Sequence, residues 1–151
     1  MPQHDNKALV RRWFDEVWNN QSTDAVHALA HPDVITYGLG ENGATGGIED
    51  FIPFRDRFVA TFPDLHIAVE DVIAEGDKTA ARIRCTGTHT GPDMGIPPTG
   101  KKVTVTGLVL VRWKDGQIIE GWNEFDAYGM MQQLAAPGPG DKSPQMMRVK
   151  Q

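Results

Sequence analysis

The first half of the chain has hydrophobic residues at the three-to-four-residue spacing of amphipathic helices. One helix is predicted over residues 9–18, where six large apolar side chains share one face and four charged ones share the other. Asp5 is its predicted N-cap. A second, short helix is predicted over residues 23–30, because Ser22 suits its start and His31-Pro32 suits its end.

A glycine-rich stretch separates these two helices from a third one. Residues 34–37 are typical of a short strand, and residues 38–47 show no periodicity, so they are expected to form a loop. The third helix is expected to begin near Ile48, where acidic residues suit a first turn. Its phenylalanines recur at helical spacing: Phe51, Phe54, Phe58 and Phe62.

The second half of the chain changes to the composition of β-strands. Four segments are rich in β-branched and apolar residues, and they span residues 65–75, 78–89, 103–113 and 117–125. Turn sequences between the first two and between the last two predict antiparallel hairpins. Residues 90–100, rich in Pro and Gly, are expected to form a stiff rim loop, and residues 127–134 a last helical turn or two.

Helices first and strands afterwards predict an α+β domain, with helices gathered on one face of an antiparallel sheet. Strand alternation places His89 on the core-facing side of its strand and Asn123 on the inward side of the last one. Leu108 and Leu110 face away from the other apolar residues of their strand. We therefore expect the middle of that strand to be covered on both sides.

Composition limits the classes of function. The chain has 151 residues and a net charge of -5, and its 15 basic residues are interspersed among 20 acidic ones, which disfavours nucleic-acid binding. No apolar run approaches the roughly 20 residues of a membrane span, and no signal peptide is visible, so a cytoplasmic protein is expected. Residues 1–136 are predicted to form one domain and residues 137–151 a polar tail rich in Pro and Gly.

Metal binding is not expected. Cys85 is the single cysteine, which excludes an internal disulfide and a multi-cysteine metal site. None of the five histidines pairs with another at the spacing of a zinc site.

The order of several short motifs resembles the SnoaL-like polyketide cyclases, or ester cyclases, of the nuclear-transport-factor-two-like superfamily. The resemblance covers roughly residues 6–135, and its motifs are His31-Pro32-Asp33, Phe62-Pro63-Asp64-Leu65, residues 87–91, residues 96–101 and residues 115–120. It implies a cone-shaped, curved antiparallel sheet wrapped around a long N-terminal helix, with two further helices and a deep pocket. It also implies closure of a ring by intramolecular aldol condensation, without metal or organic cofactor.

The resemblance places an unusual residue at the family's catalytic position. The family's proton carrier is an aspartate on the last long strand, and the corresponding residue here is Asn123, whose amide does not exchange a proton near neutral pH. A histidine of one characterised cyclase corresponds to Val109. We therefore expect His89 or Asp126 to carry the proton and Asn123 to orient a substrate carbonyl. Each has a structural alternative: His89 as an anchor for the rim loop, and Asp126 as an N-cap.

Aromatic residues are the expected contacts of a small apolar or aromatic substrate. The predicted substrate-binding residues are Trp13, His31, Tyr37, Phe54, Phe58 and Trp122. The alternative for each aromatic residue is a place in the hydrophobic core, and for His31 a structural role at the end of the second helix.

Three hypotheses of function remain open at this point. The first is a cofactor-free cyclase or isomerase acting by proton transfer on a polyketide-like or polycarbonyl molecule. The second is a hydrolase or lyase of the epoxide hydrolase or dehydratase kind, which rests on analogy of fold. The third is a module that binds a small molecule without turnover. A homodimer through the exposed face of the sheet is also expected, because Trp113 and Trp122 exceed what three helices can cover.

Overall fold

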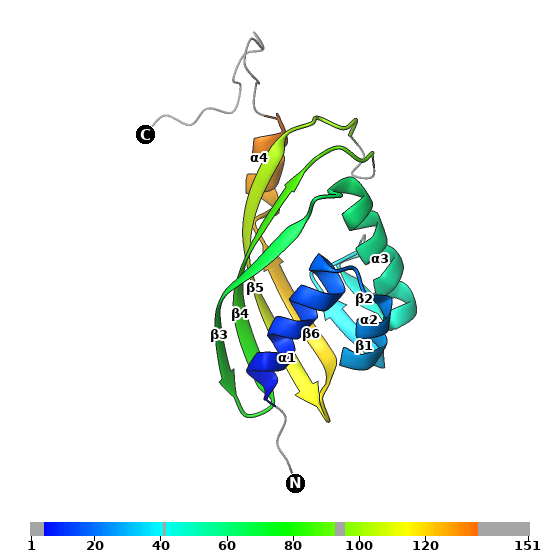
Figure 1. The fold of residues 1–151 in the computed structure, drawn as a ribbon, viewed down its shortest axis with the longest axis vertical. Helices are drawn as coiled ribbons and strands as arrows, with labels where there is room; N and C mark the ends of the chain where they lie inside the picture. The colour runs from blue at the N-terminus through cyan, green and yellow to red at the C-terminus, as the bar shows by residue number, and fades with distance from the viewer. Residues whose placement is uncertain (1–4, 41, 93–95, 136–151) are drawn as a thin grey trace.

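The computed structural model describes residues 5–40, 42–92 and 96–135, so the predicted tail lies outside the described residues. The fold is α+β, as predicted, with helices set against a curved six-stranded sheet (Figure 1). The elements in chain order are α1 (Asn6–Arg12), the π-helix η1 (Trp13–Asn19), α2 (Thr23–Leu29), β1 (Ala30–Tyr37), β2 (Ala44–Gly46), α3 (Ile48–Thr61), β3 (His66–Glu75), β4 (Lys78–Thr88), β5 (Lys102–Lys114), β6 (Gln117–Phe125) and α4 (Ala127–Ala135).

The strand order is β2-β1-β6-β5-β4-β3. The four long strands predicted from the sequence pair antiparallel, but β1 pairs with β6 in parallel, so the expectation of a wholly antiparallel sheet is wrong at this pair. The long connection between β1 and β6 permits parallel pairing, which a short hairpin cannot provide. The predicted loop of residues 38–47 contains β2, and β1 begins at Ala30, four residues earlier than expected.

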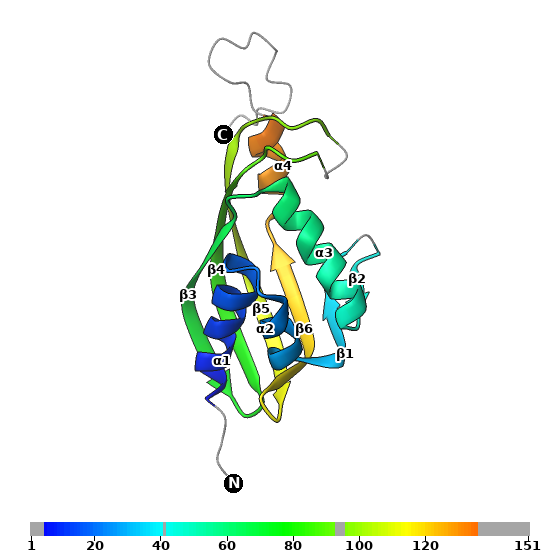
Figure 2. The same cartoon turned by 45° about the vertical axis from the view of Figure 1, so that its right-hand side comes forward.

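The helices lie on one face of the sheet. Figures 1 and 2 show α1, α2 and α3 on the inner side of its curve, whereas α4 lies at one end of the strands. Among the described residues, none of the helices combines the length and apolar character needed to cross a membrane.

The first helical segment is an α-helix in its first half and a π-helix in its second half. Asp5 caps it as predicted, because the Ala8 amide donates to Asp5 Oδ1 at 3.2 Å. From Trp13 the chain continues as a π-helix, whose wider turn brings four large apolar residues of η1 to buried positions: Trp13, Phe14, Val17 and Trp18. The side chain of Asn19 then holds the end of η1 against β3, since it accepts from the Ile67 amide at 2.7 Å and donates to the Ile67 carbonyl at 2.9 Å.

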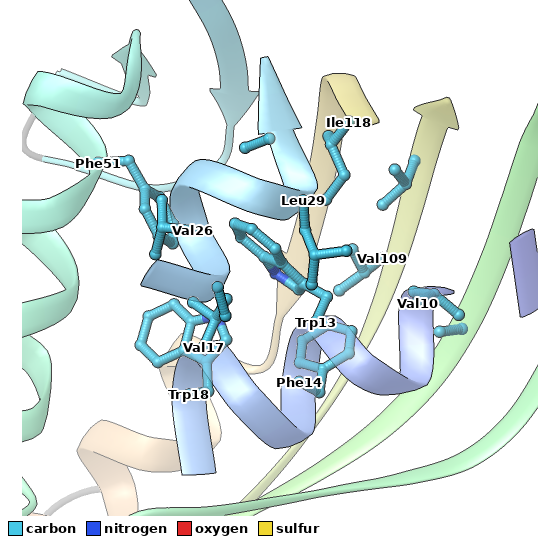
Figure 3. Close-up of a cluster of buried hydrophobic side chains, with 14 of the residues drawn as sticks. Val10, Trp13, Phe14, Val17, Trp18, Val26, Leu29, Phe51, Val109 and Ile118 are labelled. Carbon is cyan, nitrogen blue, oxygen red and sulfur yellow. The ribbon is translucent and has the colours of Figure 1, made fainter. Parts of the chain in front are cut away.

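The core lies between these helices and the inner face of the sheet. Figure 3 shows Trp13 among Leu29, Val109 and Ile118, all of them buried. Trp113 is also buried, and its indole Nε1 donates to Thr79 Oγ1 at 3.0 Å, so the expectation that this tryptophan lies on the exposed face is wrong.

The outer face of the sheet is open within this chain. Leu108 and Leu110 are 59% and 39% exposed, so within the described part of one chain the middle of β5 is covered on one side only. The apolar residues at these even positions do not reflect burial within one chain, because α1, α2 and α3 pack on the opposite face.

Candidate active-site cavity

A cavity of about 510 Å³ lies between η1, α3 and the inner face of the sheet, near the end where α4 is located. Six aromatic residues line it: Phe14, Trp18, Phe54, Phe58, Phe62 and Phe125. The remaining apolar lining includes Leu39, Leu65, Ile67, Val103, Val105 and Met130. The cavity is therefore large enough for a fused-ring molecule and is mainly apolar.

Two glycines on the sheet make room for aromatic side chains that line the cavity. Gly87 on β4 also lines the cavity, and an added Cβ there would lie 3.0 Å from Phe62. Gly107 on β5 is equally restricted, because an added Cβ would lie 2.7 Å from Phe125. The glycines thus let the aromatic side chains of Phe62 and Phe125 lie close against the sheet backbone.

Asn123 is the polar side chain that β6 contributes to the cavity. It pairs with Val109 across the inner face of the sheet, as strand alternation predicts. Its Nδ2 donates to the Tyr37 carbonyl at 2.9 Å, which fixes the plane of the amide. Among the described residues this is the one hydrogen bond found for the Asn123 side chain, so its Oδ1 atom and second Nδ2 hydrogen can bind a ligand.

Gly38, directly after β1, lies against the backbone of Asn123 on the neighbouring strand β6. Gly38 has a φ of 85°, and an added Cβ would lie 2.0 Å from the Asn123 carbonyl oxygen. Only glycine fits this close approach in this backbone conformation. Gly38 thus permits the contact through which the Tyr37 carbonyl reaches the Asn123 amide.

Cys85 lines the cavity from β4. Burial raises the pKa of its thiol to about 12, because the low-polarity surroundings disfavour the thiolate. The thiol is therefore neutral at physiological pH and acts as a small, weakly polar part of the wall, not as a nucleophile.

His89 lies beside the cavity lining and not in it. It is fully buried, with its ring 5.7 Å from that of Phe62. Its Nδ1 accepts from the Thr99 amide at 3.2 Å and shares a hydrogen bond with Thr99 Oγ1 at 3.1 Å. This geometry matches the structural alternative, in which His89 anchors the rim loop. Its Nε2 has no hydrogen-bond partner within the described part of the chain.

Asp126 follows β6 at the edge of the cavity. Its Oδ1 accepts from the Gly129 amide at 2.9 Å, so it caps α4. The residues on either side of it, Phe125 and Ala127, both line the cavity. Glu124 also borders the cavity, but its pairing with Leu108 places its side chain on the outer face.

The six predicted substrate contacts separate into three groups. Phe54 and Phe58 line the cavity. Trp13 belongs to the core below it. The others face outward: Tyr37 and Trp122 stack on the outer face with ring centroids 5.7 Å apart, and the exposed His31 accepts from the Asp33 amide through Nδ1 at 3.0 Å.

Several residues that line the cavity were not predicted. Hydrophobic periodicity identifies the buried face of a helix, but it does not show whether a residue on that face packs in the core or lines a cavity. Phe14 and Trp18 share the helical stripe that predicted the core, and they line the cavity because the chain turns into a π-helix there. Leu39 lies in the glycine-rich stretch, which has no pattern to indicate its direction. In the described part of the chain, no group of three or more His, Cys, Asp and Glu side chains is placed to hold a metal ion.

A charged residue stabilises the entrance to the rim loop. The Asp64 carboxylate accepts from the Thr88 amide at 2.6 Å and from the Thr88 hydroxyl at 2.7 Å. The bond from the Thr88 amide, with that from its hydroxyl, holds the pKa of the Asp64 carboxyl below its usual range. Asp64 therefore joins the end of α3 to the end of β4, one residue before His89.

Comparisons with known proteins agree with this architecture. The sequence profile of the SnoaL-like polyketide cyclases matches residues 8–134. The nogalonic acid methyl ester cyclase of Streptomyces nogalater is 30% identical over 127 residues, which cover 83% of this chain and 94% of that one. An aklanonic acid methyl ester cyclase of Streptomyces galilaeus is 31% identical over 134 residues, with 87% and 92% coverage.

Solved structures show the same fold. A SnoaL-like protein from Jannaschia sp. CCS1 superposes with a TM-score of 0.80 at 33% identity, covering 91% of this chain and 99% of that one. IdmH of Streptomyces antibioticus superposes with a TM-score of 0.77 at 28% identity, with 88% and 100% coverage. The chain is therefore a member of the SnoaL-like polyketide cyclase family.

Proposed function

We propose that this protein closes a ring in a polyketide-like, polycarbonyl molecule by proton transfer, without a metal or an organic cofactor. The observation that carries the proposal is the aromatic-lined cavity of about 510 Å³ with an oriented amide, Asn123, on its wall. The relatives that bear the names of methyl ester cyclases support the substrate class.

The cavity would contribute mainly by positioning. A flexible polycarbonyl chain that is folded inside an apolar pocket holds its reacting carbons close together, which removes much of the entropic barrier to ring closure. The flat faces of Phe54, Phe58 and Trp18 suit the aromatic rings of such a substrate.

Asn123 would bind the carbonyl that is attacked. One Nδ2 hydrogen is already donated to the Tyr37 carbonyl, and the other is available for a substrate oxygen. As the new carbon–carbon bond forms, this oxygen gains negative charge, and a hydrogen bond in an apolar cavity stabilises that charge more than the neutral carbonyl.

Neither predicted proton carrier lines the cavity itself, but Asp126 is better placed than His89, because both of its chain neighbours, Phe125 and Ala127, do. Its carboxylate would take a proton from the carbon between two carbonyl groups. The enolate then attacks the ketone carbon, and the protonated Asp126 returns the proton to the resulting alkoxide. Atoms and charge balance, so no cofactor is consumed.

The test uses nogalonic acid methyl ester and aklanonic acid methyl ester as substrates. Ring closure conserves mass, so product is detected as a chromatographic shift without a mass change. We expect Asn123→Ala to lower kcat/KM by roughly 100-fold, the loss typical of one oxyanion donor. We expect Asn123→Asp to retain more activity than Asn123→Ala, because it restores a carboxyl group at that position. Equal activity of Asn123→Ala and the parent would overturn the role of Asn123.

Asp126→Asn tests the proton carrier separately. Asparagine also caps helices well, so this substitution keeps α4 in place and removes only the titrating group. We expect kcat to fall by roughly 100-fold, and the acidic limb of the pH profile to disappear. An unchanged pH profile would show that another group carries the proton.

The apolar lining also supports a second candidate, binding without turnover. The hydrolase or lyase hypothesis has less support, because it rests on analogy of fold alone, whereas the relatives named above are ester cyclases. A substrate that raises the melting temperature but is never converted would favour the binding module.

A further inference from the structure

The inner face of the sheet forms an apolar floor under part of the cavity. The floor consists of Ile67 on β3, Cys85 on β4 and Val105 on β5, which the strand registers place side by side and which all line the cavity. These side chains are aliphatic or small, and no charged group stands among them. A flat apolar ligand can therefore lie on this floor with one face.

A glycine that carries an aromatic ring lies at each end of this floor. Gly87 is the glycine on β4, and an added Cβ there would lie 3.0 to 3.3 Å from three side-chain atoms of Phe62. Gly107 is the glycine on β5, and an added Cβ there would lie 2.7 and 3.1 Å from two ring atoms of Phe125. Each aromatic side chain therefore occupies the place that a side chain at the glycine would take.

The two aromatic side chains limit the length of the floor along the strands. In the pairing of β4 with β5, Gly87 and Gly107 are four residues apart in the strand direction, on opposite sides of the floor. Four residues of a strand span about 13 Å. The distance between Phe62 and Phe125 therefore limits the length of a flat ligand that lies along the strands.

The end formed by Phe62 is firmly held. Phe62 is buried, and its ring packs on the rings of Phe58 and His89 at centroid distances of 5.4 and 5.7 Å. Its closest approach to Gly87 is through its Cβ, which cannot turn away from the sheet as an outer ring atom can.

The position of the Phe125 ring depends instead on the missing side chain at Gly107. The contact is made by outer ring atoms, and an added Cβ would also lie 2.9 Å from the Glu124 carbonyl oxygen, which belongs to the backbone. A side chain at this position would therefore displace the ring away from the sheet and into the cavity.

Phe125 also stands at the boundary between the floor and the oriented amide. Along β6, Asn123 is the next inward-facing residue before Phe125, and both line the cavity. The rings of a ligand on the floor and a carbonyl bound by Asn123 therefore lie on different sides of the Phe125 side chain.

We propose that Phe125, seated on Gly107, is a specificity-determining residue that sets the length of the fused-ring system that the cavity accepts. The inference rests on the proposed function in taking a fused-ring molecule as the ligand. It adds that rings lie on the floor up to Phe125, and that the part of the substrate beyond the rings reaches Asn123.

The affinities of two rigid probes test this proposal. Anthraquinone has three linearly fused rings and naphthacenequinone has four, and neither carries a chain that can close into a further ring. Quenching of tryptophan emission measures both dissociation constants, because Trp18 belongs to the cavity wall. The readout is the ratio of the two constants, because a loss of folded protein changes both by the same factor.

We expect Phe125→Leu to strengthen the binding of naphthacenequinone relative to anthraquinone by roughly tenfold, which is the lower end of the effect of one methylene group in an apolar pocket. Gly107→Ala should change the ratio in the opposite direction, because it pushes the Phe125 ring into the cavity. Combining the two substitutions should return the ratio at least to that of the parent protein, because leucine removes the collision.

The matched control is Gly121→Ala on the inner face of β6. An added Cβ at Gly121 meets no atom nearer than 3.9 Å, and neither Gly121 nor Gly107 has a positive φ. The two substitutions therefore add the same methyl group to the same face of the sheet, and only Gly107→Ala displaces an aromatic ring. We expect Gly121→Ala to leave the ratio unchanged.

Every other result counts against the proposal. A ratio that Phe125→Leu does not change, or a double variant that is no better than Gly107→Ala, overturns the role of Phe125. A parent protein that binds neither probe overturns the flat ligand. Turnover is measured separately, so the expected ratios in a parent protein that closes no ring would support the length limit and refute the proposed ring closure.

Discussion

At the scale of single residues, the polar group of the cavity is Asn123, and a neighbouring glycine allows the contact that orients it. Asn123 is oriented by the Tyr37 carbonyl, and Gly38 lets the two strands approach closely enough for this bond. The inward direction of Asn123 could be predicted from strand alternation. Its partner could not, because β1 and β6 are far apart in the sequence and the pattern does not show that they pair.

Gly38→Ala tests this contact, with Gly43→Ala as the control. Both glycines have a φ near 85°, but an added Cβ at Gly43 meets nothing within 4 Å. We expect the control to lose about 1 kcal/mol of unfolding free energy from the backbone conformation alone. Gly38→Ala should lose about 3 kcal/mol, because the collision with Asn123 is added. Urea unfolding measures both, and equal losses would contradict the close contact.

Because folding raises the pKa of the Cys85 thiol, we expect the stability of the protein to depend on pH. The unfolded thiol titrates near pH 9.0, and the folded one near 12. Between these values the unfolded chain releases the proton first, so the free energy of unfolding falls as the pH rises from about 9 to 12. Cys85→Ala lacks this group. We expect its stability to fall less steeply than that of the parent in urea titrations over the same range, and parallel curves would contradict the raised pKa.

At the scale of elements, two side-chain amides hold helices against exposed strand backbone. Asn19 of η1 makes reciprocal hydrogen bonds with Ile67 on β3. Gln133 of α4 does the same with Thr104 on β5, beyond the point where β6 ends, at 2.8 Å in both directions. Each amide takes the place of a missing strand, so η1 and α4, two of the helices that line the cavity, are fixed to the sheet.

Gln133→Ala tests how firmly α4 is held, with Gln132→Ala as the matched control. Gln132 is exposed, and its one side-chain hydrogen bond in the described residues is to the Tyr128 hydroxyl at 3.2 Å. We expect Gln133→Ala to lose about 2 kcal/mol of stability, because two strand backbone groups lose their partner. Hydrogen exchange at the Thr104 amide should become faster in that variant alone. Equal exchange in both variants would show that Gln133 does not hold α4.

Element existence could be predicted better than element pairing. The helices and the four long strands follow from periodicity and turn sequences, and the caps at Asp5 and Asp126 follow from residue type. The short β2 was missed, because three residues among glycines give no alternation to detect. The π-helix was missed because its buried residues also fit an ordinary helical stripe.

At the scale of the whole molecule, the cavity is the feature that the sequence alone could not establish. The same aromatic residues are compatible with a filled core or with a lined pocket, and only their arrangement in the structure distinguishes the two. The apolar positions Leu108 and Leu110 of β5 also have two interpretations, because apolar residues occur both on covered and on exposed faces of a sheet. Their pattern predicts coverage on both sides of the strand, but Leu108 and Leu110 are exposed in the described part of the chain.

The pairing of β1 with β6 also has a consequence for the order of folding. Strands β3 to β6 join through successive antiparallel pairs, whose β3–β4 and β5–β6 contacts are close in sequence, whereas the hydrogen bond from Asn123 to Tyr37 spans 86 residues. Closing so long a loop costs more chain entropy, so we expect β1 to dock after these strands have formed. The cavity then gains its oriented amide in the last step. A ligand that needs this amide would distinguish the native chain from late folding intermediates.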